Sequence, residues 1–120
     1  MRLVFFILFL FPFIIFSQEV ITEDNFKSKI NKDIVVIEFY AEWNKDNCVD
    51  LKVFKDVDSY MVNIEDSPNL AQEYNILSVP TLIVFNNKKV VEKYCADLTF
   101  QLSTKKAQKK VEELVLKKFM

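Results

Sequence analysis

The stretch Ile34-Val-Val-Ile-Glu-Phe-Tyr-Ala-Glu-Trp-Asn-Lys-Asp-Asn-Cys48 decides the fold. Its first half, residues 34–40, is apolar and β-branched around one carboxylate, which predicts a strand buried on both faces of a parallel or mixed sheet. Its second half is polar. A buried strand that ends in a polar turn brings that turn to the carboxyl edge of the sheet, where open α/β folds place their sites. We therefore look for function in residues 43–48.

Two segments resemble the thioredoxin family. Phe39-Tyr40-Ala41-Glu42-Trp43 is similar to the segment that leads into the family's Trp-Cys-x-x-Cys active site, and Ser78-Val79-Pro80-Thr81 is similar to its cis-proline segment. The residues between them keep a similar order and spacing, so the resemblance covers nearly the whole chain after residue 17. It implies a thioredoxin-like α/β fold, with a central mixed sheet of four or five strands and helices on both faces.

The chain departs from this family at the two redox positions. Asn44 and Asn47 stand where the resemblance places the two cysteines. An amide has no thiolate form, so neither residue can attack a disulfide. This favours a protein that is not an enzyme. If it is one, the resemblance implies a thiol-disulfide oxidoreductase.

Glu38 stands where the resemblance places a buried acid beneath the site. Burial in an apolar strand makes a carboxyl easier to protonate than in water. Met61 replaces the lysine that neighbours this acid in many relatives, so a second catalytic feature is missing. A structural carboxylate with a hydrogen-bond partner is then the simpler interpretation of Glu38.

Trp43, Val79 and Pro80 predict a docking surface. By the resemblance, Trp43 helps to shape the contact surface for partner proteins, and such an aromatic is a common hot-spot residue. Packing against the following helix is the alternative. Val79 and Pro80 resemble the cis-proline segment, whose neighbouring residue offers backbone hydrogen bonds to an extended chain. With Trp43, Asn44 and Asn47 they could bind a protein or extended peptide by strand addition.

Cys48 and Cys95 are the only thiols. Three interpretations stay open: two unpaired structural thiols, one disulfide if their Cα atoms come within about 7 Å, or redox catalysis by Cys48 with or without Cys95. Because a helix start lowers the pKa of a thiol, Cys48 would be reactive if it lay exposed at the start of a helix.

Residues 1–17 have the form of a secretory signal peptide. Arg2 precedes the apolar run 3–16, and the small residue Ser17 closes it. The run is shorter than the roughly 18 apolar residues that a spanning helix needs, which disfavours a retained anchor. We therefore expect cleavage after Ser17, export to the periplasm or outside the cell, and one thioredoxin-like domain over residues 18–120 without stable membrane insertion.

Composition narrows the classes of function. The net charge of -1 disfavours nucleic-acid binding, and two cysteines without histidine disfavour a metal site. No cofactor is expected, and a monomer is the simplest assembly. Glycine is absent, whereas average usage of about 7% would give roughly eight in this length. The tight turns must therefore use Asn, Asp, Ser, Lys or Pro.

Local patterns predict the remaining elements. Thr22 is a candidate cap for a helix that buries Phe26 and Ile30. A helix is expected over residues 47–54, a hairpin around residues 86–88, and a last helix from about residue 104 towards residue 119. These residues predict partner binding by an exported, redox-inactive thioredoxin relative, with a divergent oxidoreductase as the alternative.

Overall fold

The structure, a computed structural model, describes residues 19–119 and contains one five-stranded mixed sheet. The strand order is β1-β3-β2-β4-β5, with β1 at Val20–Ile21, β2 at Ile34–Tyr40, β3 at Asp58–Asn63, β4 at Thr81–Asn86 and β5 at Lys89–Cys95. Strands β1, β3 and β2 run parallel, whereas β4 runs antiparallel to both β2 and β5. The predicted mixed α/β fold is confirmed.

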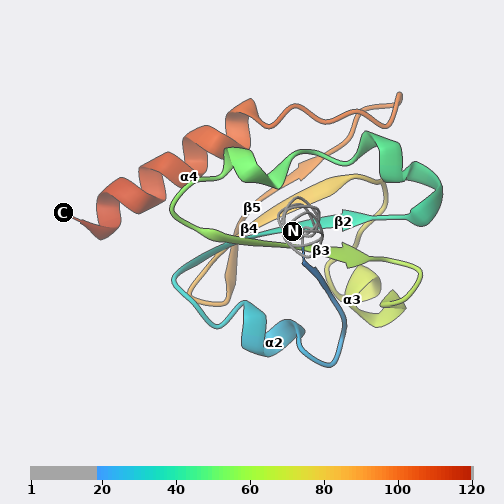
Figure 1. Cartoon of the computed structure of the whole chain (residues 1–120), viewed down its shortest axis with the longest axis horizontal. Helices are drawn as coiled ribbons and strands as arrows, with labels where there is room; N and C mark the ends of the chain where they lie inside the picture. The colour runs from blue at the N-terminus through green and yellow to red at the C-terminus, as the bar shows by residue number, and fades with distance from the viewer. Residues whose placement is uncertain (1–18, 120) are drawn as a thin grey trace, which may run out of the picture.

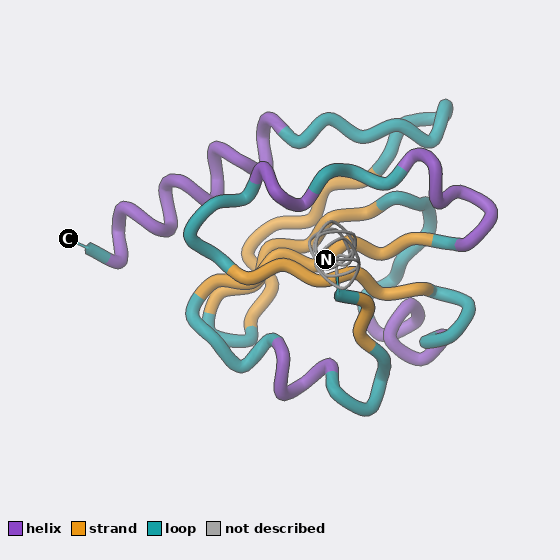
Figure 2. The backbone as a smooth tube through the Cα atoms, viewed as in Figure 1, coloured by secondary structure: helices purple, strands orange, loops and turns teal. Residues whose placement is uncertain are grey.

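Helices cover both faces of the sheet (Figure 1, Figure 2). The short helices α2 (Phe26–Lys29) and α3 (Pro68–Glu73) lie on one face, and the long helix α4 (Lys105–Lys118) lies on the other. Side chains of β2 alternate between the two resulting cores: Val35, Ile37 and Phe39 pack with Phe26, while Ile34, Val36 and Tyr40 pack with Val111. All seven residues of β2 are buried, as a strand covered on both faces requires.

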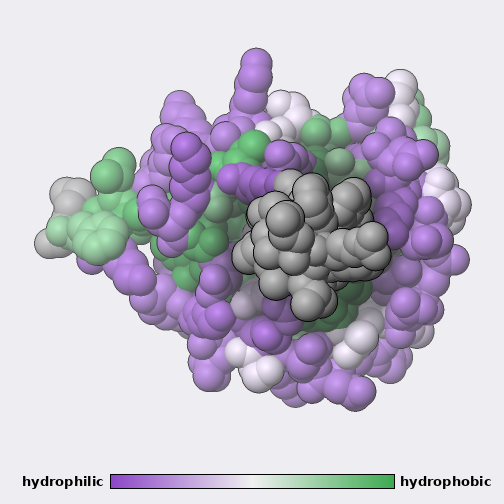
Figure 3. Space-filling model, in the orientation of Figure 1, coloured by the Kyte–Doolittle hydropathy of each residue, from purple (hydrophilic) through white to green (hydrophobic). Residues whose placement is uncertain are grey.

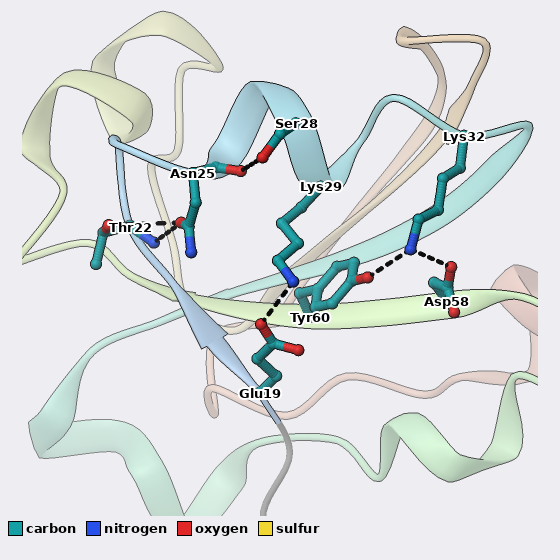
Figure 4. A network of polar contacts seen from close by, with 8 residues as sticks. All are labelled: Glu19, Thr22, Asn25, Ser28, Lys29, Lys32, Asp58 and Tyr60. Carbon is teal, nitrogen blue, oxygen red and sulfur yellow. Dashed lines mark hydrogen bonds and ion pairs between the residues drawn. The ribbon is translucent and has the colours of Figure 1, made fainter.

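The start of α2 differs from the sequence-based prediction. Asn25, rather than Thr22, precedes the first helical residue, and its side chain accepts the backbone N–H of Thr22 at 2.8 Å (Figure 4). The prediction that Phe26 and Ile30 are buried is confirmed. Two exposed ion pairs tie this region to neighbouring strands, Lys29 to Glu19 at 2.9 Å and Lys32 to Asp58 at 2.6 Å. Exposed pairs of this kind contribute about 0–1 kcal/mol each.

The helix expected over residues 47–54 does not form. Two 3-10 helices, η2 (Glu42–Asn47) and η3 (Leu51–Val53), flank an extended stretch that begins at Cys48. Two backbone N–H groups of this region bond outside a helical pattern: Val49 donates to the Glu38 carboxylate at 2.7 Å, and Lys52 donates to the Asp50 side chain at 3.0 Å. Val49, Leu51 and Val53 alternate with polar residues, and this spacing of two fits an extended path better than a helix.

Residues other than glycine adopt the left-handed conformation at the turns. Asn87 and Lys88 have φ of 52° and 71° in the β4–β5 hairpin, which confirms the prediction of an asparagine-based turn. Asp56 and Asn75 also have positive φ. Phe100, at φ 61°, falls outside the residue types expected in such turns.

The predicted signal peptide at residues 1–17 lies outside the described residues. Within residues 19–119, no helix has both the length and the apolar character needed to cross a bilayer. The boundary at residue 18 therefore stays a prediction.

Candidate functional site

Three segments meet at the carboxyl end of β2. These are η2, which follows β2, the stretch 78–80 ahead of β4, and the loop 96–104 between β5 and α4. In Figure 1 they lie together on the right-hand side of the view, away from the end of α4. Trp43 in η2 is 65% exposed, so the alternative of a tryptophan packed beneath a following helix is wrong.

The two asparagines form a chain of hydrogen bonds across this edge. Asn44 is buried, and its Nδ2 donates to the backbone carbonyl of Val79 at 2.9 Å. Asn47 is exposed, and its Nδ2 donates to Asn44 Oδ1 at 2.9 Å. The Val79–Pro80 peptide bond is cis, as the resemblance implied. The side chain at the first redox position is therefore a structural tie between η2 and the cis-proline segment.

Glu38 lies in the core beneath η2 and is fully buried. Desolvation raises its pKa from 4.5 to about 7, although the hydrogen bond from the Val49 N–H lowers it. Its Oε2 accepts that bond at 2.7 Å, whereas Oε1 has no hydrogen-bond partner within residues 19–119. Met61 is its partner in the β2–β3 register, so an uncharged thioether occupies the neighbouring position on β3. Glu38 anchors the extended stretch at Val49.

Both cysteines are free, and they differ in their surroundings. Cys48 is half-buried next to Glu38, and desolvation together with the adjacent carboxylate raises its pKa to about 12. The expectation of a helix start that lowers this pKa is wrong, because the backbone at Cys48 is extended. Cys95 is exposed at the end of β5. Of the three interpretations left open, the geometry matches unpaired thiols.

Phe100 belongs to the site, although its sequence context gave no reason to select it. Its ring lies 5.3 Å from the Trp43 ring, centroid to centroid, in a T-shaped arrangement. Contacts of this geometry contribute about 0.5–1.5 kcal/mol beyond the buried area. The absence of glycine predicted Asn, Asp, Ser, Lys or Pro at the turns and gave no signal for Phe100.

The exposed groups of this site are aromatic and amide side chains. Residues 19–119 hold no group of three or more histidine, cysteine, aspartate or glutamate side chains placed to bind a metal ion. What the site offers at its surface is an exposed aromatic pair and the exposed Asn47 amide, whereas Val79 and Pro80 are buried. Groups of these types are common at surfaces that contact other polypeptides.

Comparison with known sequences agrees with this geometry. The sequence model of the family described as Thioredoxin matches residues 17–109. The chain belongs to the thioredoxin family. A thioredoxin of Chlamydia trachomatis is 33% identical over 86 residues, which are 62% of this chain and 80% of that one. A thioredoxin of Buchnera aphidicola is 28% identical over 81 residues, covering 59% and 75%.

Solved structures of thioredoxins share the fold. The crystal structure of Malassezia sympodialis thioredoxin has a TM-score of 0.61 and 27% identity, over 81% of this chain and 90% of that chain. Mitochondrial thioredoxin 3 of Saccharomyces cerevisiae has a TM-score of 0.64 at 19% identity, over 81% and 95%. Family membership and fold are thus established together, while the two asparagines distinguish the site of this chain from a Cys-x-x-Cys site.

Proposed function

We propose that this protein is an exported, redox-inactive member of the thioredoxin family that binds a protein or an extended peptide through Trp43 and the Val79–Pro80 segment. The hydrogen bond from Asn44 Nδ2 to the Val79 carbonyl, at 2.9 Å, carries this proposal. It supports a role for the first redox position in fixing the docking segment. The exposed Trp43 beside it supports contact with another molecule.

Two observations argue against a thiol-disulfide oxidoreductase that uses Cys48. A pKa raised to about 12 leaves very little thiolate near neutral pH, and the thiolate is the attacking species. Cys48 is also half-buried, and Cys95 is free rather than its disulfide partner. The residues around Cys48 therefore favour an inert structural thiol.

Export rests on the form of residues 1–17. A positive residue, an apolar run and a small closing residue support a cleaved leader. Sequencing the N-terminus of the protein recovered from the envelope fraction is expected to give Gln18. An intact Met1 in the cytosolic fraction would contradict export.

A thiol-free probe separates binding from redox chemistry. Reduced and carbamidomethylated insulin B chain is an extended polypeptide that cannot form a disulfide, and this blocking group adds no charge. We expect the natural protein and its Cys48→Ser variant to bind it equally by calorimetry. Trp43→Ala, a change at an exposed side chain, is expected to weaken binding by about 2 kcal/mol or more, as hot-spot truncation does.

Leu116→Ala is the matched control for this test. Leu116 is 64% exposed, close to the exposure of Trp43, but it lies on α4. The control is expected to leave the affinity unchanged. Equal losses for both variants, or binding that Trp43→Ala does not alter, would show that the proposed surface is wrong.

A further inference from the structure

We propose that the Trp43–Phe100 surface binds an extended and positively charged segment of the partner. This inference rests on the binding function proposed above and adds the chemistry of the ligand. It starts from the exposed aromatic pair itself: Trp43 is 65% and Phe100 42% exposed, and their rings meet edge to face. Exposed aromatic pairs of this kind are typical of contact surfaces.

The loop that carries Phe100 is held in a costly conformation. Phe100 has a φ of 61°, a region in which a bulky side chain is strained by about 1–3 kcal/mol. The Asp97 side chain fixes the loop by accepting the N–H groups of Thr99 at 2.8 Å and Gln101 at 3.2 Å. Glycine would adopt this turn without strain but would place no ring against Trp43. The strained residue is therefore the one that supplies the second ring of the aromatic pair.

Four carboxylates lie in the segments that carry the aromatic pair or bond to them. Glu42 adjoins Trp43 in the chain, Asp46 follows in the same 3-10 helix, and Glu65 Oε1 accepts the Glu42 N–H at 3.0 Å. Asp97 lies in the Phe100 loop. All four are exposed, and within residues 19–119 none of them forms an ion pair with a lysine.

Within these segments Lys45 is the one lysine. Three lysines, Lys93, Lys105 and Lys106, line the same pocket as Asp97. The excess of negative charge is therefore centred on Glu42, Asp46 and Glu65. In Figure 3 the right-hand side of the view is mainly hydrophilic, with pale and apolar side chains at its upper corner over the loop after β5. A segment that presents lysine or arginine can bind both the carboxylates and the aromatic rings of this surface. Its cations pair with the carboxylates and also bind the faces of aromatic rings.

The backbone beside the aromatic pair favours an extended partner. Val79 is only 3% exposed, and its carbonyl already accepts the Asn44 amide, but its N–H has no acceptor among residues 19–119. An extended chain has free carbonyls to accept this N–H, whereas the carbonyls in the body of a helix are bonded within the helix. The lysine-rich helix α4 of a second copy is therefore a poorer fit, although its charge is complementary.

Binding of three labelled peptides of equal length to the protein, produced from the full-length chain, tests this inference. One alternates lysine with phenylalanine, and the other two carry glutamine or glutamate in place of lysine. By fluorescence anisotropy at low salt we expect the lysine peptide to bind at least about tenfold more tightly than the glutamine peptide, and the glutamate peptide to bind most weakly. Added salt is expected to narrow these differences.

A variant that lacks the carboxylates tests whether the preference for the lysine peptide arises at the Trp43–Phe100 surface. We expect the triple variant Glu42→Gln, Asp46→Asn, Glu65→Gln to lose the lysine preference and to keep its affinity for the glutamine peptide. The matched control, Asp24→Asn, Glu92→Gln, Glu112→Gln, removes three exposed carboxylates elsewhere and is expected to keep the preference. Equal effects of the two variants would reduce the preference to net charge and contradict the inference.

The remaining outcomes separate this inference from the function on which it rests. If all three peptides bind equally and Trp43→Ala weakens each of them, the charge inference is wrong and the binding function stands. If no peptide binds, the binding function fails and the inference fails with it. Sedimentation of the protein alone tests whether a second copy of this chain occupies the surface. If the protein is a dimer and the triple variant Glu42→Gln, Asp46→Asn, Glu65→Gln is a monomer, a second copy is the occupant and the inference is wrong.

Discussion

The two segments that meet at the site, residues 42–54 and residues 78–81, have diverged from the thioredoxin pattern to different extents. The first has asparagine at both redox positions and two 3-10 helices in place of the expected helix. The second keeps the cis Val79–Pro80 bond at the start of β4. One segment has changed its chemistry and its backbone, while the other has kept its geometry.

The contact between these segments explains how the second one is held without a redox pair beside it. Asn44 reaches across from η2 to the Val79 carbonyl, and Glu38 secures the far end of the first segment through the Val49 N–H. The residue at a redox position of the family can thus become a structural support while the neighbouring cis-proline geometry persists. Changes at Cys48, Glu38, Asn44 and Phe100 test how these two segments differ.

The largest expected effect concerns the thiol in the first segment. A rise in pKa from 9.0 to about 12 lowers the thiolate fraction of Cys48 by a factor on the order of 10³ at a given pH. We expect Cys95→Ser, which leaves only Cys48, to abolish the fast reaction with an aromatic disulfide reagent. Cys48→Ser is expected to retain it. A fast reaction in the Cys95→Ser protein would show that Cys48 is activated.

The second effect is a pH dependence of stability that originates at Glu38. Its pKa is about 7 in the folded protein against an ordinary 4.5, so the folded state binds this proton more tightly than the unfolded state. Stability contributed by the protonated carboxyl is complete below pH 4.5 and is lost as the pH rises through about 7. The loss amounts to about 3 kcal/mol of unfolding free energy.

Glu38→Gln is the reference variant for this measurement, because it keeps the size and an acceptor but does not titrate. We expect the difference in urea-unfolding free energy between the natural protein and the variant to change by that amount between about pH 4.5 and about pH 7.5. Parallel pH profiles for the two proteins would mean that Glu38 titrates normally and that its burial carries no such cost.

The third effect is on the tie between the two segments. Asn44→Ala removes the donor to the buried Val79 carbonyl, and we expect a loss of about 2 kcal/mol of unfolding free energy. Asn47→Ala is the matched control, since Asn47 is exposed and its side chain bonds to Asn44 alone among residues 19–119; its cost is expected to stay below about 1 kcal/mol. Equal costs at both positions would refute the role given to Asn44.

The smallest effect is expected at Phe100. Phe100→Gly removes the backbone strain of a left-handed phenylalanine, which stabilises the fold. It also removes the ring that contacts Trp43, which destabilises the fold. We expect the unfolding free energy to change by less than about 1 kcal/mol, while the affinity for the lysine peptide falls several-fold. A large stability loss would show that Phe100 serves packing rather than binding.

Much of the fold could be predicted from local patterns, and the exceptions have physical causes. The run at residues 34–40 predicts a doubly buried strand because every residue but Glu38 is apolar or aromatic, and the hairpin follows from Asn87. The helix over residues 47–54 was wrong because the Val49 N–H finds a carboxylate that is distant in sequence. Phe100 could not be predicted, since its position depends on a loop fixed by Asp97.

The site itself was only partly accessible to sequence reasoning. The residues at the redox positions and the cis-proline segment can be aligned with the family pattern, which places Asn44, Asn47 and Val79 near one another. The hydrogen bond from Asn44 to Val79 depends on the direction of a side chain, and the raised pKa of Cys48 depends on its burial and on the nearby Glu38 carboxylate. Neither can be derived from the order of residues.

The central claim is that the docking geometry of a thioredoxin site persists here without its thiol chemistry. Insulin reduction with dithiothreitol tests it directly, in the natural protein, in Cys48→Ser, and in the double variant Asn44→Cys with Asn47→Cys. We predict no turnover above the dithiothreitol background in the first two proteins and measurable turnover in the third, because the strand, Trp43 and the cis-proline segment are in place. Activity in the natural protein that Cys48→Ser abolishes would contradict the claim.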